Sequence, residues 1–174
     1  MGNQLENQIK ALREIYKEIK KSGTKIEPII LGKFALTVYT QGMYPAGKIT
    51  LLYPDLELLH KVLKNLGYEQ MGNHWVRGDT VIEVSNQFEL IPVAKFNKID
   101  VDDFQINVIS LEHLLIDMMN QCVEGDFTVC DLIKMLMRSY FNFIDFHYLY
   151  RNLKDKRAVK EFKEMRESIL KEAN

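Results

Sequence analysis

Apolar residues recur every three or four positions at the start of the chain, with lysine and glutamate between them. This spacing places the apolar side chains on one face, so it predicts an amphipathic helix over residues 4–21 that ends at Ser22-Gly23. The residues of that face are Leu5, Ile9, Leu12, Tyr16 and Ile19. A helix with a single apolar face needs a packing partner, which the following segments are expected to supply.

Two short apolar runs come next, and a helical pattern follows each of them. Residues 26–31 predict a buried strand, and the apolar spacing from Phe34 predicts a short helix that ends near Gly42. Residues 49–53 predict a second strand. Asp55 is suited to cap a third helix over residues 56–66, since its side chain can accept a hydrogen bond from the first turn. The order predicts a βαβα unit.

From residue 68 the pattern changes to short strands and then to helices. Strands over 68–71 and 74–76 flank a Gly72-Asn73 turn, Arg77-Gly78-Asp79 leads into a strand over 80–85, and an extended segment covers 104–109. Helical spacing then covers residues 111–123, 127–139, 143–153 and 155–172. We therefore predict an α+β fold. Residues 1–110 would form a small mixed β-sheet with flanking helices, and residues 111–174 a C-terminal helical region packed on that core.

The composition of the 174 residues is typical of a globular protein, with 47% hydrophobic and 27% charged residues. Apolar runs are short and the first residues lack a signal-peptide pattern, so we expect no membrane association and a cytoplasmic location. The net charge is -1, and the basic residues near both ends fit solvated helix faces, so nucleic-acid binding is not expected. Cys122 and Cys130 lack partners for a zinc site and are expected to be small buried hydrophobes.

Several segments resemble the nucleotidyltransferase fold, and specifically the uncharacterised prokaryotic proteins related to abortive-infection and antitoxin nucleotidyltransferases. Ile29-Ile30-Leu31-Gly32-Lys33-Phe34-Ala35-Leu36 is similar to the family's apolar strand, glycine turn and following helix. Val81-Ile82-Glu83-Val84 is similar to the strand that carries the family's third acid. Val108-Ile109-Ser110-Leu111-Glu112-His113-Leu114-Leu115, with Asp131-Leu132-Ile133 after it, is similar to the start of the helical half. The resemblance covers about residues 27–136.

In that family the glycine turn holds a triphosphate, and two acids spaced Asp-x-Asp join a third acid in holding Mg²⁺. The metal ions neutralise the negative charge that gathers at phosphorus during transfer. Here Lys48 and Thr50 stand where the resemblance places the paired acids, and Lys33 stands where a second small turn residue would be. Because an ammonium group cannot ligate magnesium, the resemblance implies a degenerate site that cannot perform metal-dependent transfer.

The candidate site has two parts. Glu83 would hold metal or serve as general base if any catalysis remains, while Gly32, Lys33, Lys48 and Thr50 would receive a nucleotide phosphate or another anion. We expect no metal or other cofactor, and Mg²⁺ only if the site is active. Structural roles compete with this interpretation, since lysines at element ends extend to solvent and Glu83 fits a solvent-facing strand position.

Two other functions stay open. An active metal-dependent nucleotidyltransferase could use substitute acids, for example Asp55 with Glu83. A protein-interaction module, antitoxin-like or scaffold, could act through the helical half. Aromatic residues cluster there and fit either core packing or a homodimer contact. They are Tyr140, Phe141, Phe143, Phe146, Tyr148 and Tyr150. The acidic residues Asp100, Asp102 and Asp103 are expected to form a solvated loop.

Overall fold

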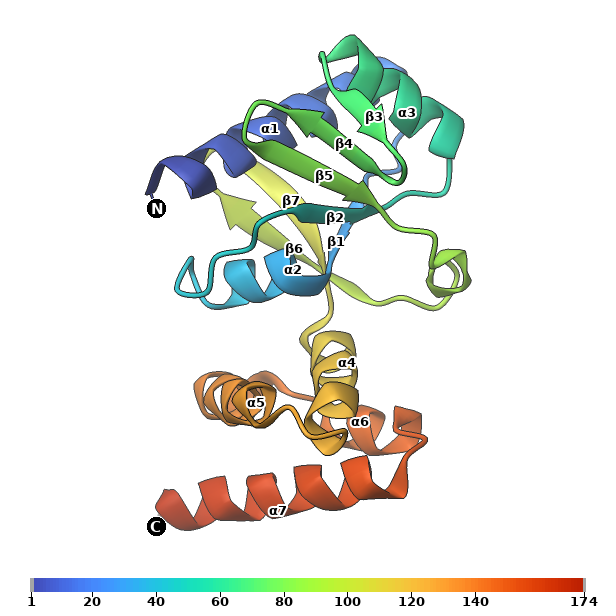
Figure 1. The fold of residues 1–174 in the computed structure, drawn as a ribbon. Helices are drawn as coiled ribbons and strands as arrows, with labels where there is room; N and C mark the ends of the chain where they lie inside the picture. The colour runs from blue at the N-terminus through green and yellow to red at the C-terminus, as the bar shows by residue number, and fades with distance from the viewer. Residues whose placement is uncertain (1, 174) are drawn as a thin grey trace. The chain divides into compact units, whose positions relative to one another are not determined.

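The computed structural model describes residues 2–173 and confirms an α+β architecture. The chain divides into two compact units on either side of the Ser110–Leu111 peptide bond, and each is described by itself. The first unit contains a seven-stranded mixed sheet with helices, and the second unit is helical (Figure 1). No helix among residues 2–173 is both long enough and apolar enough to cross a bilayer.

The strand order in the sheet is β3-β4-β5-β2-β1-β7-β6. The strands are β1 (Ile29–Leu31), β2 (Ile49–Leu52), β3 (Glu69–Met71), β4 (His74–Arg77), β5 (Thr80–Val84), β6 (Phe96–Val101) and β7 (Phe104–Ile109). β1 pairs in parallel with β7, and β2 pairs in parallel with β5. The other neighbouring pairs are antiparallel. The central strands therefore come from segments that are far apart in the sequence.

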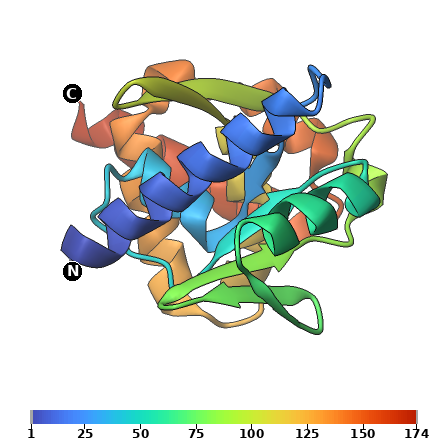
Figure 2. The same cartoon turned by 90° about the horizontal axis from the view of Figure 1, so that it is seen from above.

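Helices cover both faces of this sheet. They are α1 (Gly2–Lys21), α2 (Gly32–Tyr39) and α3 (Leu56–Asn65). α1 and α3 lie on one face and α2 lies against the other (Figures 1 and 2). Leu12, Tyr16 and Ile19 of the predicted apolar face are buried, while Leu5 and Ile9 are half-buried. Ile15, which the prediction did not include, is also fully buried. The predicted cap of α3 is also confirmed, because an Asp55 carboxylate oxygen accepts a hydrogen bond from the Leu58 amide at 3.0 Å.

The second unit consists of helices with their own core. They are α4 (Leu111–Val123), α5 (Phe127–Ser139), α6 (Phe146–Asn152) and α7 (Lys156–Glu172), with a short 3-10 turn η2 (Phe141–Phe143). An aspartate caps each of the last three helices: Asp126, Asp145 and Asp155 accept backbone hydrogen bonds at the start of α5, α6 and α7. Fully buried residues include Leu115, Met119, Ile133, Met137, Leu149 and Phe162. These side chains explain why the segment is compact.

Strand β6 was not predicted from the sequence. Its residues Phe96-Asn97-Lys98-Ile99-Asp100-Val101 are exposed or half-buried, so no alternation of buried and exposed positions marks them. Asp100 therefore lies in a strand, and the loop expectation is wrong for this residue. Asp102 and Asp103 form the connection between β6 and β7. The expectation of solvation fits them, although Asp103 also accepts a hydrogen bond from the Arg13 guanidinium at 2.7 Å. A short 3-10 turn η1 (Phe88–Leu90) was also not predicted.

The expectation of two unlinked hydrophobic cysteines is wrong. Cys122 in α4 and Cys130 in α5 form a disulfide, across a sequence separation of 8 residues. Gly125, with φ +112, turns the chain between the two helices and brings their ends together. The sequence spacing allowed this pairing but could not show that the two side chains point toward each other.

Candidate functional site

The glycine turn lies where β1 passes into α2. Gly32 has φ +66, a left-handed backbone conformation that side-chain-bearing residues rarely adopt. Its neighbour on the sheet is Thr50, because the β1–β2 register pairs Leu31 with Thr50. A Cβ atom placed on Gly32 would lie 3.7 Å from the Thr50 hydroxyl oxygen. The turn and the second strand are thus in direct proximity.

The ammonium group of Lys48 contacts the carboxylate of Glu83 directly. Lys48 Nζ is 2.6 Å from Glu83 Oε2, and the Thr50 hydroxyl donates to Glu83 Oε1 at 3.2 Å. The geometry follows from the sheet, because β2 and β5 are parallel and Thr50 is the register partner of Glu83. Glu83 lies on the half-buried face of β5, since Thr80, Ile82 and Val84 are the buried positions of that strand. The Lys48 side chain is 46% exposed and that of Glu83 only 22%.

His74 also contacts Glu83, and the sequence interpretation did not include it. His74 Nε2 is 3.2 Å from Glu83 Oε2, and the two residues are register partners in the β4–β5 hairpin. The signal was present in the sequence, because the predicted Arg77-Gly78-Asp79 turn fixes the register of the two strands. Counting back from the Arg77–Thr80 pair places His74 opposite Glu83.

The charges around Glu83 favour its ionised form. Partial burial alone would raise the pKa of this carboxyl group. The hydrogen bond and positive charge of Lys48 outweigh burial, with further contributions from the Thr50 hydroxyl and from His74, so that the pKa of Glu83 lies below its ordinary value of 4.5. Glu83 therefore acts as an internal counter-ion for Lys48 at neutral pH.

The predicted site residues do not all meet. Four of them come together at the end of β1 and the facing parts of β2 and β5: Gly32, Lys48, Thr50 and Glu83. Lys33 follows the glycine, and its side chain is exposed. Among the described residues, no hydrogen bond or ion pair joins Lys33 to Lys48, Thr50 or Glu83. The Lys33 side chain adds a positive charge near the turn.

The residues present do not fit the Mg²⁺ ions that the resemblance implies. A magnesium site needs several oxygen ligands with enough negative charge to replace water, and this one offers a single carboxylate that already contacts an ammonium group. Asp55, the substitute acid considered from the sequence, caps α3 with its side chain. Among the described residues, no group of three or more histidine, cysteine, aspartate or glutamate side chains could hold a metal ion.

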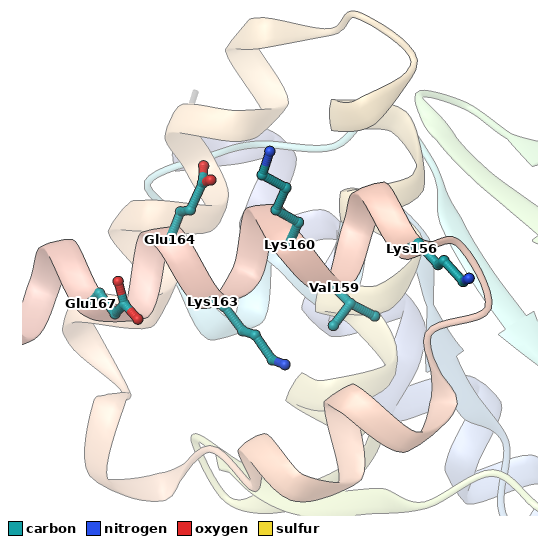
Figure 3. Close-up of a pocket in the computed structure, with 6 residues that line it drawn as sticks. All are labelled: Lys156, Val159, Lys160, Lys163, Glu164 and Glu167. Carbon is teal, nitrogen blue, oxygen red and sulfur yellow. The ribbon is translucent and has the colours of Figure 1, made fainter.

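A hollow of ≈ 380 Å³ is present in the second unit, and none of the predicted site residues lines it. Side chains of α7 alone line it: Lys156, Val159, Lys160, Lys163, Glu164 and Glu167 (Figure 3). Figure 3 shows these side chains extending from one helix. Ligand sites are usually concave and walled by more than one element. We therefore interpret it as a depression between long charged side chains and not as a substrate site.

Comparison of the chain with protein-family models, with curated proteins and with solved structures found no match. The nucleotidyltransferase resemblance therefore stays a prediction from the sequence.

Proposed function

We propose that this protein has a nucleotidyltransferase-like fold, no longer performs metal-dependent transfer, and binds a nucleotide or another phosphate-bearing anion. One observation carries the proposal: the Lys48 ammonium group contacts the single carboxylate of the site at 2.6 Å. In this position the ammonium supplies the positive charge that a metal ion would otherwise supply. The site therefore keeps a charge for phosphate and loses the ligands for metal.

The backbone around Gly32 supports phosphate binding. The first N–H groups of a helix have no partner within the helix, and they carry a partial positive charge. Leu31, which precedes α2, makes no capping hydrogen bond through its side chain. Lys33 and Lys48 add two positive charges against the one negative charge of Glu83, which leaves a net charge of about +1 near the turn. We propose that a phosphate group binds there, in competition with Glu83 for the Lys48 ammonium.

This competition provides a sharp test. ATP binding is measured by isothermal titration calorimetry in EDTA for the wild type and for two variants. Lys48→Met should weaken binding about tenfold, because it removes the central positive charge. Glu83→Gln should strengthen binding severalfold, because it removes the competing carboxylate. Lys64→Met, on the exposed side of α3, is the matched control and should bind as the wild type does.

An active transferase predicts the opposite result for Glu83. If Glu83 holds a metal, the wild type should bind ATP only when Mg²⁺ replaces EDTA, and Glu83→Gln should abolish this binding together with a magnesium-dependent release of pyrophosphate. Absence of ATP binding to the wild type in EDTA, or a loss of binding in Glu83→Gln, would contradict the proposal. The assay thus separates an anion-binding protein from an enzyme that uses substitute acids.

Exposed aromatic residues favour a second candidate, the interaction module. Phe127 at the start of α5 is 77% exposed, and Phe143 of the aromatic cluster is 81% exposed, whereas Phe146 of that cluster is buried. Large exposed apolar side chains are enriched at protein interfaces. We propose that these two residues contact a protein partner or a second copy. Phe143→Ser should then weaken self-association in sedimentation experiments, and an unchanged association would exclude a homodimer through Phe143.

The sequence led us to expect a cytoplasmic location. The Cys122–Cys130 disulfide argues against this location, because disulfides are rare in reducing cytosol and common in oxidising compartments. The oxidation state of these two cysteines in cells can be measured by trapping free thiols with an alkylating reagent. Two free thiols would support a cytoplasmic location, and an intact disulfide would support an oxidising compartment.

A further inference from the structure

Strand β6 forms one edge of the sheet and is twice as long as the strand at the other edge. β6 has six residues and β3 has three. Within residues 2–110, the strand order ends at β6, so no strand pairs with its outer side (Figure 1). An edge strand presents a row of unpaired N–H and C=O groups that can pair with another chain, unless proline, a bulge, a covering element or repulsion between charged side chains prevents it. β6 contains no proline.

The hydrogen-bond pattern shows which residues of β6 face outward. The Ser110 N–H donates to the Lys95 carbonyl at 2.8 Å, just before the Phe96–Ile109 register pair. In an antiparallel ladder, hydrogen-bonded pairs alternate with pairs that share no hydrogen bonds. It follows that the backbone groups of Asn97, Ile99 and Val101 bond to β7. Those of Phe96, Lys98 and Asp100 point to the free edge.

We propose that the free edge of β6 pairs with β6 of a second copy of this chain, in an antiparallel register centred on Ile99. This register places Lys98 of each copy directly opposite Asp100 of the other. It also pairs outward-facing backbone groups with outward-facing backbone groups, as an antiparallel ladder requires. The two Ile99 residues face each other at the symmetry axis. The contact is isologous, so it closes as a dimer and does not grow into a filament.

Charge selects this register over its neighbours. A register centred on Lys98 places two lysines opposite each other, and a register centred on Asp100 places two aspartates opposite each other. Like charges directly opposite on adjacent strands destabilise the pair, and opposite charges stabilise it. Both Lys98 and Asp100 are exposed, so they can reach a second copy. Phe96 is 42% exposed at the start of the same strand, and pairing along this edge would cover part of its ring.

Charge-swap variants test this register. Lys98→Asp places an introduced aspartate opposite Asp100 of the other copy, and Asp100→Lys places an introduced lysine opposite Lys98 of the other copy. Sedimentation equilibrium of the full chain over a wide concentration range should show a monomer–dimer equilibrium for the wild type. Each single variant should raise the dimer dissociation constant about tenfold or more.

Restoring complementarity should restore the dimer. An equimolar mixture of Lys98→Asp and Asp100→Lys places opposite charges at both contacts, and so does the double variant Lys98→Asp/Asp100→Lys alone. Both samples should dimerise as the wild type does, which also shows that the variants are folded. Glu69→Lys, on the opposite edge strand β3, is the matched control and should not change the equilibrium. A monomeric wild type, or a dimer that persists in both single variants, would overturn the proposal.

Discussion

At the residue scale, Gly32 is needed for the backbone conformation of the turn, whether or not a ligand binds there. Its φ of +66 is strained for a residue with a side chain, while the space around a Cβ atom there holds no contact shorter than 3.7 Å. Gly32→Ala should therefore destabilise the protein through backbone strain alone, by about 1 kcal/mol. Gly47 has no left-handed backbone and no atom within 4 Å of a Cβ atom, so Gly47→Ala should leave stability unchanged or raise it slightly. Urea unfolding of the two variants measures the difference, and equal effects would contradict this explanation.

The ion pair of Glu83 makes its contribution to stability depend on pH. The folded-state pKa of Glu83 lies below its ordinary value of 4.5, so the contribution is fully present above pH 4.5 and is lost as pH falls through the lower folded-state value. NMR titration of the Glu83 carboxyl carbon should give a midpoint below 4.5. Lys48→Met should raise this midpoint, because it removes the hydrogen bond and the charge that favour the carboxylate. A midpoint that does not move in Lys48→Met would show that Lys48 does not interact with Glu83 in solution.

Local sequence signals predicted part of the site. Four residues chosen from the strand–turn–helix order and the strand positions do meet in space: Gly32, Lys48, Thr50 and Glu83. The direct contact between Lys48 and Glu83 was not predicted, because it depends on the parallel pairing of β2 with β5, which are separated by a helix and two strands. The contact of His74 with Glu83 was also not predicted, because it follows from the register of the β4–β5 hairpin and not from a local motif.

At the element scale, the disulfide between α4 and α5 is expected to stabilise the second unit. A cross-link that closes a loop of this length restricts the unfolded chain, which corresponds to roughly 2–3 kcal/mol in the chain-entropy model. Reduction, or the double variant Cys122→Ser/Cys130→Ser, should therefore speed hydrogen exchange of the α4 and α5 amides. The reductant should have no effect on the double variant, which is the control. Unchanged exchange after reduction of the wild type would contradict the expected stabilisation.

Elements with a clear apolar period were easier to predict than those without one. The apolar face of α1 and the Asp55 cap of α3 are local signals, and the structure confirms both. Strand β6 carries no such signal, because its side chains are exposed or half-buried and its partner β7 comes later in the chain. The backbone hydrogen bonds that hold β6 to β7 do not appear in the side-chain pattern. β6 is also the last strand in the sheet order, which leaves it with the free edge proposed for self-pairing.

At the scale of the whole molecule, two units with separate cores need not unfold together. The chain has one tryptophan, Trp75, and it lies 4% exposed in β4 of the first unit. Its fluorescence therefore reports on the first unit alone. Reduction of the Cys122–Cys130 disulfide should leave the urea midpoint of Trp75 fluorescence unchanged, while hydrogen exchange in α4 and α5 becomes faster. A shift of the fluorescence midpoint on reduction would show that the two units unfold as one.

The central claim is that the Lys48 ammonium stands in for a metal ion beside Glu83. The most direct measurement is paramagnetic line broadening by Mn²⁺ at the backbone amides around Glu83, compared between the wild type and Lys48→Asp/Thr50→Asp. Together with Glu83, the double variant has three carboxylates, one just before β2, one in β2 and one in β5, which are enough to ligate a divalent cation. We predict site-specific broadening in the double variant and none in the wild type. Broadening around Glu83 in the wild type at the same Mn²⁺ concentration would contradict the claim.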